Sequence, residues 1–485
     1  VAPLRKDVEV AADLSGSIYG TMLWPYTLRH QSDVGGSLTW ASASILTEPW
    51  NPIAGTNWIY DTALIRSTGQ WSFMPDPNTG LTWPQRVQSF DVTVKEGLPV
   101  GKTNDWLTLT FAPEIQVPDD AWIDWDASEQ RFITAGEGYT ETQTALVKTT
   151  TTYPADLFET VKWHDGSPLS VGDMVMRLIM VFDDAKPESA IFDEAEVPSL
   201  ESFMSTFKGI RITSTNPMTV EFYSDNWSLD AESAISNLRT LWPYYGFGEA
   251  PWHTVALGVR GDAKGLASFS ADKAAAKEIE QFNYIAGPTV KTLADQLAEA
   301  TDETYIPYAP TMADYVTPEE ASARYDNLAE WYAERGHFWV GTGPFILKKA
   351  FPVEGTVTLE RNPDFPDMAD KWSRFAEPVI AEVSVDGPGQ VTSGEAATFD
   401  VIVEYQGEAY AAADIQEVKY LAFDATGELV DSGTATAVED GLWRVQLAPE
   451  LTSGLEAGSN RLEVVVVSKL VALPSLGAIE FVTTP

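Results

Sequence analysis

The hydrophobic period of the chain changes after Glu377-Pro378, and this change limits the possible folds more than any other sequence feature. Beyond it the helical period disappears, and short runs of alternating apolar and polar residues take its place. Turn-forming pairs such as Thr426-Gly427 and Asp440-Gly441 separate these runs. The runs are Val379–Val385, Thr398–Tyr405, Glu417–Phe423, Leu429–Thr436, Leu442–Leu447, Arg461–Val467 and Ala478–Val482.

Seven strands within residues 377–485 predict an all-β sandwich of the immunoglobulin or fibronectin type. The chain has no cysteine, so core packing must stabilise such a sandwich without a disulfide. The same absence excludes thiolate catalysis and cysteine-based zinc sites. The run Val464–Val467 is interpreted as a buried strand, although at an exposed edge it could pair with another chain.

Residues 35–376 mix both periods and predict one α+β lobe, so the chain as a whole is assigned to the α/β class. Strands are predicted at Ser37–Leu46, Phe90–Val94, Trp106–Phe111 and Ala145–Thr151, and hairpins over 209–225 and 345–361. Helices are predicted at Leu169–Phe182, Ala271–Phe282, Val290–Ala300 and Pro318–Arg335. Residues 1–34, with a helix at Leu4–Leu14 and an extended exit at Trp24–Leu28, are interpreted as the tail end of an upstream lobe.

Charge excludes several classes of partner. The chain carries 71 acidic and 31 basic side chains, a formal net charge of −40. A field of this sign repels phosphate backbones and anionic lipid surfaces, so nucleic acid is not expected as a partner. The longest apolar run, Leu462–Leu473, is interrupted by polar residues and is too short to span a membrane.

Three motifs occur in a particular order along the lobe. They are Trp50-Asn51-Pro52, the segment VKWHDGSPLSVGDMV at Val161–Val175, and the segment VGTGPFILKKAFPVEGTVTLERNPDF at Val340–Phe365. In this order they resemble the extracellular solute-binding proteins of ABC importers, in the oligopeptide, dipeptide and nickel-binding class. The resemblance covers roughly residues 35–366, with insertions at 95–145 and 226–335. It implies a lobe of the periplasmic-binding-protein type.

The residues of these motifs are expected to shape the backbone and not to perform chemistry. Their residue types indicate how each one would do so. Gly166 permits a turn with positive φ, and Asp165 can accept hydrogen bonds from nearby backbone amides. Gly341 and Gly343 allow a backbone to pass close to another segment. Arg361 is expected to hold Asp364 or a carbonyl across its turn. The scaffold residues are Trp163, Asp165, Gly166, Gly341, Gly343, Arg361 and Asn362.

The sequence departs from the family after Arg361-Asn362-Pro363-Asp364, where a second lobe ordinarily follows. Here the predicted sandwich comes next. The chain therefore resembles the C-terminal half of a long, rearranged member. Its second lobe is expected upstream, either cut away or on a separate chain, and this lobe or other copies of the chain are the expected protein partners besides a permease.

No residue pattern points to catalysis or to a metal. The histidines His30, His164, His253 and His337 lack the spacing of metal ligands, and no Gly-x-Ser-x-Gly elbow accompanies His164-Asp165. The run Asp124–Glu129 is interpreted as an acidic surface loop, since it lacks the glycine and terminal Glu of a calcium loop. Neither enzymatic activity nor a cofactor is predicted. A hydrolase with paired carboxylates ranks last among the alternatives.

Aromatic residues in loop-like sequence are the candidates for ligand contact. The segment LWPYYGFGEAPW at Leu241–Trp252 is the best candidate, because Pro243, Gly246 and Gly248 are expected to expose its rings. Core packing is the competing interpretation for most of these rings. The residues proposed to contact a ligand are Trp50, Trp58, Trp242, Tyr244, Tyr245 and Trp252.

Together these features predict an extracellular or cell-surface binding protein that captures a solute by cleft closure and presents it to an importer permease. The family resemblance favours a peptide, and the aromatic content favours an oligosaccharide. The alternative from another class is a structural subunit of a surface layer or filament, built from the lobe and the immunoglobulin-like module.

Overall fold

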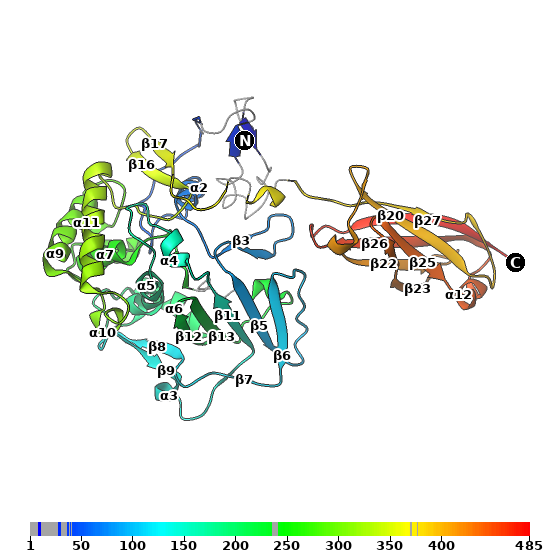
Figure 1. Ribbon diagram of the computed structural model, residues 1–485, viewed down its shortest axis with the longest axis horizontal. Helices are drawn as coiled ribbons and strands as arrows, with labels where there is room; N and C mark the ends of the chain where they lie inside the picture. Colours follow the sequence, from blue (N-terminus) through cyan, green and yellow to red (C-terminus); the bar gives the residue numbers. More distant parts are fainter. Residues whose placement is uncertain are drawn as a thin grey trace. The chain divides into compact units, whose positions relative to one another are not determined.

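The computed structural model describes residues 8–10, 28–30, 36–37, 39, 41–234, 241–368, 371–375 and 377–485. The chain forms two compact units (Figure 1). The first, called the lobe here, comprises Val1–Pro75 and Thr82–Ser373. The second, called the sandwich unit, comprises Asp76–Leu81 and Arg374–Pro485. The predicted boundary between residues 376 and 377 lies close to the point where the lobe ends.

A seven-stranded sheet is the main β structure of the lobe, with strand order β6-β5-β11-β13-β12-β8-β9. Only β5 and β6 are parallel within it. Val92, Thr149 and Phe222 occupy one row across three strands and are all buried. Buried and less buried residues alternate along β11, as expected for a sheet with one covered face. The strands are β5 (Ser89–Lys95), β6 (Leu107–Ala112), β8 (Trp122–Asp126), β9 (Arg131–Thr134), β11 (Val147–Thr152), β12 (Phe207–Thr215) and β13 (Met218–Ser224).

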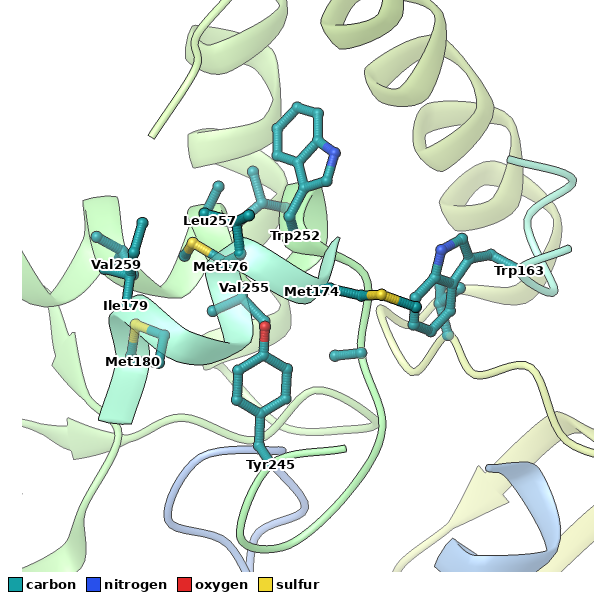
Figure 2. Packing of buried hydrophobic residues seen from close by; sticks show 14 of the residues in the cluster. Trp163, Met174, Met176, Ile179, Met180, Tyr245, Trp252, Val255, Leu257 and Val259 are labelled. Atoms are coloured by element: carbon teal, nitrogen blue, oxygen red, sulfur yellow. The ribbon is translucent and has the colours of Figure 1, made fainter. Parts of the chain in front are cut away.

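Four longer helices supply most of the remaining core: α5 (Val171–Phe182), α7 (Trp252–Ala263), α9 (Thr289–Glu303) and α11 (Pro318–Arg335). Helices α7, α9 and α11 lie side by side, and α5 contacts α7 (Figure 1). Ser170 and Asp173 form a capping box that begins α5. Figure 2 shows side chains of α5 and α7, such as Met176 and Val255, packed together in the core of the lobe.

Shorter elements complete the lobe. The helices are α2 (Ile59–Thr68), α3 (Ala135–Gly138), α4 (Leu157–Thr160), α6 (Val197–Met204), α8 (Ala271–Lys277) and α10 (Ala309–Met312). The strands are β1 (Val8–Val10), β2 (Leu28–His30), β3 (Phe73–Pro75), β4 (Thr82–Pro84), β7 (Ile115–Gln116), β10 (Thr144–Ala145), β14 (Ala267–Ser268), β15 (Glu280–Gln281), β16 (Phe345–Phe351) and β17 (Thr356–Arg361).

Most predicted elements of the lobe are confirmed, and three are wrong at least in part. Val8–Val10 of the predicted helix Leu4–Leu14 form a strand that pairs with β2, and the rest of that prediction lies outside the described residues. The described residues of Ser37–Leu46 contain no strand. The helix predicted to reach Phe282 ends at Lys277, because Glu278 adopts a left-handed conformation and β15 follows.

The sandwich unit contains two facing sheets, of order β18-β20-β25-β24 and β19-β27-β26-β22-β23. Lettered in chain order, these are strands A-B-E-D and A′-G-F-C-C′, which is the arrangement of an immunoglobulin-like fold. The strands are β18 (Glu382–Asp386), β19 (Gln390–Thr392), β20 (Ala397–Tyr405), β22 (Ile415–Phe423), β23 (Leu429–Thr434), β24 (Thr436–Glu439), β25 (Leu442–Leu447), β26 (Gly458–Ser468) and β27 (Ser475–Thr484), with the short β21 (Glu408–Ala409) on β20 and the helix α12 (Pro449–Gly454).

All seven strands predicted from the sequence are present, and Leu429–Thr436 divides into β23 and β24. The short strand β19 was not predicted. Val464–Val467 belongs to β26, which lies between β27 and β22. The alternative of an exposed edge is therefore wrong for this run. Among the described residues of the chain, no helix is both long and apolar enough to cross a membrane.

Candidate functional site: the junction of the three motifs

The third motif lies directly against the C-terminal end of α2. The Gly343 amide donates to the carbonyl of Thr68 over 3.0 Å. A Cβ added at Gly341 would lie 2.0 Å from the Thr68 oxygen, and one at Gly343 would lie 2.4 Å from the Thr68 carbonyl carbon. Neither position has room for a side chain, which confirms the predicted close passage of two backbones.

His164 joins the second motif to the third. Its amide donates to the carbonyl of Gly341 over 2.9 Å, and its Nε2 lies 3.0 Å from the carbonyl oxygen of Gly343. Because a carbonyl only accepts, Nε2 carries the hydrogen, and Nδ1 accepts from the Gly341 amide at 3.3 Å. Burial lowers the pKa of His164 to about 4, so the ring is neutral at pH 7.

Asn362 reaches the same carbonyl from the far end of the third motif. Its Nδ2 donates to the Gly343 oxygen over 3.0 Å, and its Oδ1 accepts from the Asp364 amide at 3.0 Å. The expectation for Arg361 is wrong, since among the described residues its exposed side chain hydrogen-bonds neither Asp364 nor a carbonyl across the turn. The side chain that spans this turn is the neighbouring amide of Asn362.

The first motif is buried beside the other two. Trp50 packs edge-on against Trp339, with ring centroids 5.2 Å apart, and Trp339 Nε1 donates to Thr68 Oγ1 over 2.8 Å. Asn51 donates to the carbonyls of Phe269 and Phe282 over 3.0 and 3.1 Å. All three motifs therefore converge around the C-terminal end of α2 and the segment that crosses it.

The turn of the second motif has the predicted local geometry. Gly166 has a φ of +88°, and Asp165 Oδ1 accepts from the Ser167 amide at 3.0 Å. Both expectations are confirmed. The other carboxylate oxygen of Asp165 lies 2.8 Å from Nε2 of His253, a contact that the sequence does not suggest because the two residues are far apart in the chain.

That contact belongs to a buried network of charged groups, named the Arg324 network here. Arg324 donates from both terminal nitrogens to the carboxylate of Asp173, each over 3.0 Å, and its Nη1 lies 3.3 Å from His253 Nδ1. Trp163 Nε1 also donates to Asp173, over 3.1 Å. Arg324, Asp173 and His253 are at most 1% exposed, so no substrate can reach them. The network stabilises the turn.

Glu249 links the aromatic loop 241–252 to the third motif. Its Oε1 accepts from Trp242 Nε1 and Thr342 Oγ1, each over 2.7 Å, and its Oε2 accepts from the Thr342 amide at 2.6 Å. Burial outweighs these hydrogen bonds and raises the pKa of Glu249 to about 7. The sequence analysis did not select Glu249, although it is the single acidic residue of an otherwise apolar and aromatic segment.

The aromatic loop does not expose its rings. Trp242 is 1%, Tyr245 4% and Trp252 0% exposed, and Trp50 is fully buried as well. The predicted exposure is therefore wrong for the three loop rings, because Glu249 binds the loop to Thr342 in the interior and Gly248 packs against Trp339. Burial also rules out the ligand contact proposed for Trp50. Figure 2 shows Tyr245 and Trp252 within the core cluster.

The two remaining candidates differ from the buried rings. Tyr244 is half-buried and packs edge-on against Trp71, with centroids 5.0 Å apart. Trp58, immediately before α2, is 39% exposed and lies beside the exposed Tyr60. Of the six proposed ligand contacts, Trp58 offers the most accessible ring, and its role stays a prediction.

The described residues contain no group of three or more His, Asp or Glu side chains that could hold a metal ion. The acidic run 124–129 forms the end of β8 and the turn to β9. Asp126 Oδ1 accepts from the amides of Ser128 and Glu129, each over 3.0 Å, and Asp124 pairs with Lys186. These carboxylates therefore stabilise the turn and its surroundings.

Comparison with known proteins finds matches only among solved structures. No protein-family model and no curated protein matches the chain. A CARDB domain of a Pyrococcus furiosus protein, solved in complex with di-metal ions, is 15% identical and covers 21% of this chain and 87% of its own, with a TM-score of 0.15. A PKD domain of an M14-like peptidase from a Thermoplasmatales archaeon is 11% identical and covers 22% of this chain and 94% of its own, with a TM-score of 0.14. Both domain types are immunoglobulin-like sandwiches.

Proposed function

We propose that this chain is an extracellular solute-binding component of an ABC importer, whose lobe is of the periplasmic-binding-protein type. The convergence of the three motifs carries the proposal. Motifs separated by more than a hundred residues in the sequence meet at the Gly343 carbonyl and the end of α2. Such convergence is expected of residues that define one scaffold, and their order along the chain is that of the resembled family.

The chemistry of the junction supports binding without reaction. Its ionisable groups are hydrogen-bonded to the protein itself, and Glu249 and the Arg324 network are buried, whereas His164 is half-buried. Catalysis would require an acid, base or nucleophile within reach of a substrate. The mechanism we propose is therefore non-covalent, with affinity set by closure around the solute and recognition of the closed state by a permease. The second lobe expected from the sequence stays a prediction.

Calorimetric titration of the full chain with neutral oligosaccharides and with short peptides tests this proposal. We expect saturable binding to at least one of these classes, and mass spectrometry of the recovered solute should show it unchanged. Hydrolysis of the solute would contradict a binding role. Open-ended polymers in light scattering, together with no solute binding, would favour the structural subunit instead.

A further inference from the structure

A cleft lies on the covered face of the seven-stranded sheet, away from the junction of the motifs. Two rows of neighbouring strands form its floor. Val147, Ser224 and Phe207 occupy one row, and Thr149 and Phe222 occupy the next. The lining residues are Val147, Thr149, Phe203, Thr206, Phe207, Phe222, Ser224, Asn226, Trp227, Ser228, Ser233 and Ala234.

One wall of the cleft comes from α6 and the residues that follow it. Phe203 stacks on Phe207, with ring centroids 4.6 Å apart, and Phe207 packs against Phe222 at 5.4 Å. Helix α6 contacts β12, and Figure 1 shows it beside the strands of the floor. These three rings give the cleft a rigid aromatic side, because each ring is held by the next.

Another part of the lining comes from the loop 226–234, which is fixed at both ends. At its start, the Asn226 amide donates to Ser224 Oγ over 2.9 Å. At its end, the carboxylate of Glu232 accepts from the amides of Thr103 and Asn104 over 2.7 and 2.6 Å. Trp227 lies between these anchors with 37% of its surface exposed. The loop therefore presents one accessible indole at the rim of a preformed cleft.

The lining has a specific chemical character. The described residues that form it include four aromatic rings, several hydroxyls and one side-chain amide, but no charged side chain. Thr149 is 1% exposed, and its hydroxyl has no hydrogen-bond partner within the described chain. A buried hydroxyl without a partner is unfavourable, and a polar group of a ligand would relieve that cost.

We infer that this cleft binds a neutral, hydroxylated ring of the solute, that is, one sugar residue of an oligosaccharide. The inference rests on the proposed function and selects between its two solute classes. Aromatic faces suit the apolar face of a sugar ring, and hydroxyl and amide groups suit its hydroxyls. A free peptide carries an ammonium and a carboxylate, and the described residues of the lining offer no opposite charge to compensate for their burial.

The experiment uses the full chain and titration calorimetry with a panel of neutral di- and trisaccharides of glucose, galactose, mannose and xylose, with trialanine as the peptide probe. Trp227→Ala removes the rim indole, and Thr149→Val removes the unpartnered hydroxyl. Tyr139→Ala is the matched control, since Tyr139 and Trp227 are 40% and 37% exposed and Tyr139 does not line the cleft. We expect Trp227→Ala to weaken sugar binding about tenfold or more, and Tyr139→Ala to leave the dissociation constant unchanged.

The other outcomes distinguish failure of the sugar site in the cleft from failure of the proposed solute-binding function. If a saccharide binds but Trp227→Ala and Thr149→Val both keep wild-type affinity, the cleft is not its site, and the proposed function survives. If trialanine binds and no saccharide does, the assignment of the solute class is overturned. If neither class binds to a protein with a normal melting temperature, the proposed function fails as well. Thr149→Val keeps the volume of the side chain, so a folded variant is available even if Trp227→Ala is unstable.

Discussion

The lobe and the sandwich unit bury different kinds of residue. The described core of the lobe contains many charged side chains, among them Asp173, Glu249 and Arg324. In the described part of residues 377–485, the buried polar side chains are Thr452, Asn460, Ser468 and Thr483, none of which is charged. The one buried charged residue described in the sandwich unit is Asp76, in its separate segment Asp76–Leu81. One unit therefore depends on buried electrostatic partners, whereas the other depends on apolar alternation.

This difference shows how each unit specifies its structure. In the sandwich unit, residues such as Phe399 and Val464 are buried simply because they occupy the inward positions of a strand. In the lobe, a buried charge is tolerable only when partners from distant segments are all in place. The lobe should therefore be far more sensitive to the loss of a single polar partner.

The largest expected effect is that of Arg324→Met, which leaves the carboxylate of Asp173 buried without its cation. Removal of one partner from a buried ion pair costs about 3–5 kcal/mol of the free energy of unfolding. Urea unfolding followed by tryptophan fluorescence measures it in the lobe, because Trp443 is the only tryptophan of residues 377–485. Arg324→Lys keeps the positive charge, so its free energy of unfolding should fall by less than that of Arg324→Met. A cost below 1 kcal/mol for Arg324→Met would mean that the network does not hold the lobe together.

A second effect depends on pH. The pKa of Glu249 is raised from 4.5 to about 7 in the folded lobe, so folding favours its protonated form. Its contribution to stability is complete below pH 4.5 and is lost as the pH rises through 7. At about 1.4 kcal/mol per unit, the loss is about 3 kcal/mol. His164 acts in the opposite direction, because its pKa of about 4 makes stability fall as the pH drops from 6.5 toward 4.

The difference in stability between the wild type and Glu249→Gln isolates the carboxyl group from these histidine effects. We expect the wild type to lose stability relative to the variant by about 3 kcal/mol between pH 4.5 and 8. Glu159→Gln, which removes an exposed carboxylate of the same unit, serves as the control. A flat profile for Glu249→Gln would show that this carboxyl titrates normally in the fold.

The same contrast explains what could be predicted from the sequence. The strands of the sandwich unit and the helix Pro318–Arg335 follow local periods and local caps, such as Thr317 and the left-handed Gly336. Helix α7 was missed because all its residues from Trp252 to Asp262 are buried, which leaves no amphipathic period to detect. Within the site, the close approach at Gly341 and Gly343 was predictable from residue type alone.

The parts of the site that were not predicted depend on contacts between distant segments. Glu249 binds Thr342, and Arg324 binds Asp173, across 93 and 151 positions of the sequence respectively. No local pattern encodes such a partner. The aromatic loop was predicted to be exposed for the same reason, since its burial follows from the contacts of Glu249 with Trp242 and Thr342.

A smaller effect is expected from overpacking at the junction. Gly343→Ala places a Cβ 2.4 Å from the backbone of Thr68, which cannot move without shifting the end of α2. Such strain costs about 1–3 kcal/mol. Gly101→Ala is the matched control, because nothing lies within 4 Å of its added Cβ. Thermal unfolding should show a lower melting temperature for Gly343→Ala only, and equal melting temperatures would mean that the two backbones can separate freely.

The smallest effect should come from Arg444→Met in the sandwich unit, the exposed counterpart of Arg324→Met. Arg444 pairs with Asp400 over 2.8 Å, but the two side chains are 45% and 40% exposed. Water screens such a pair and solvates Asp400 when its partner is lost, so the loss of stability should be far smaller than that of Arg324→Met. Far-UV circular dichroism of urea unfolding measures it, and 1 M salt should abolish even this difference. If Arg444→Met lowered the free energy of unfolding as much as Arg324→Met does, burial would not explain why the lobe depends on its charged residues. The contrast between the two units would then fail.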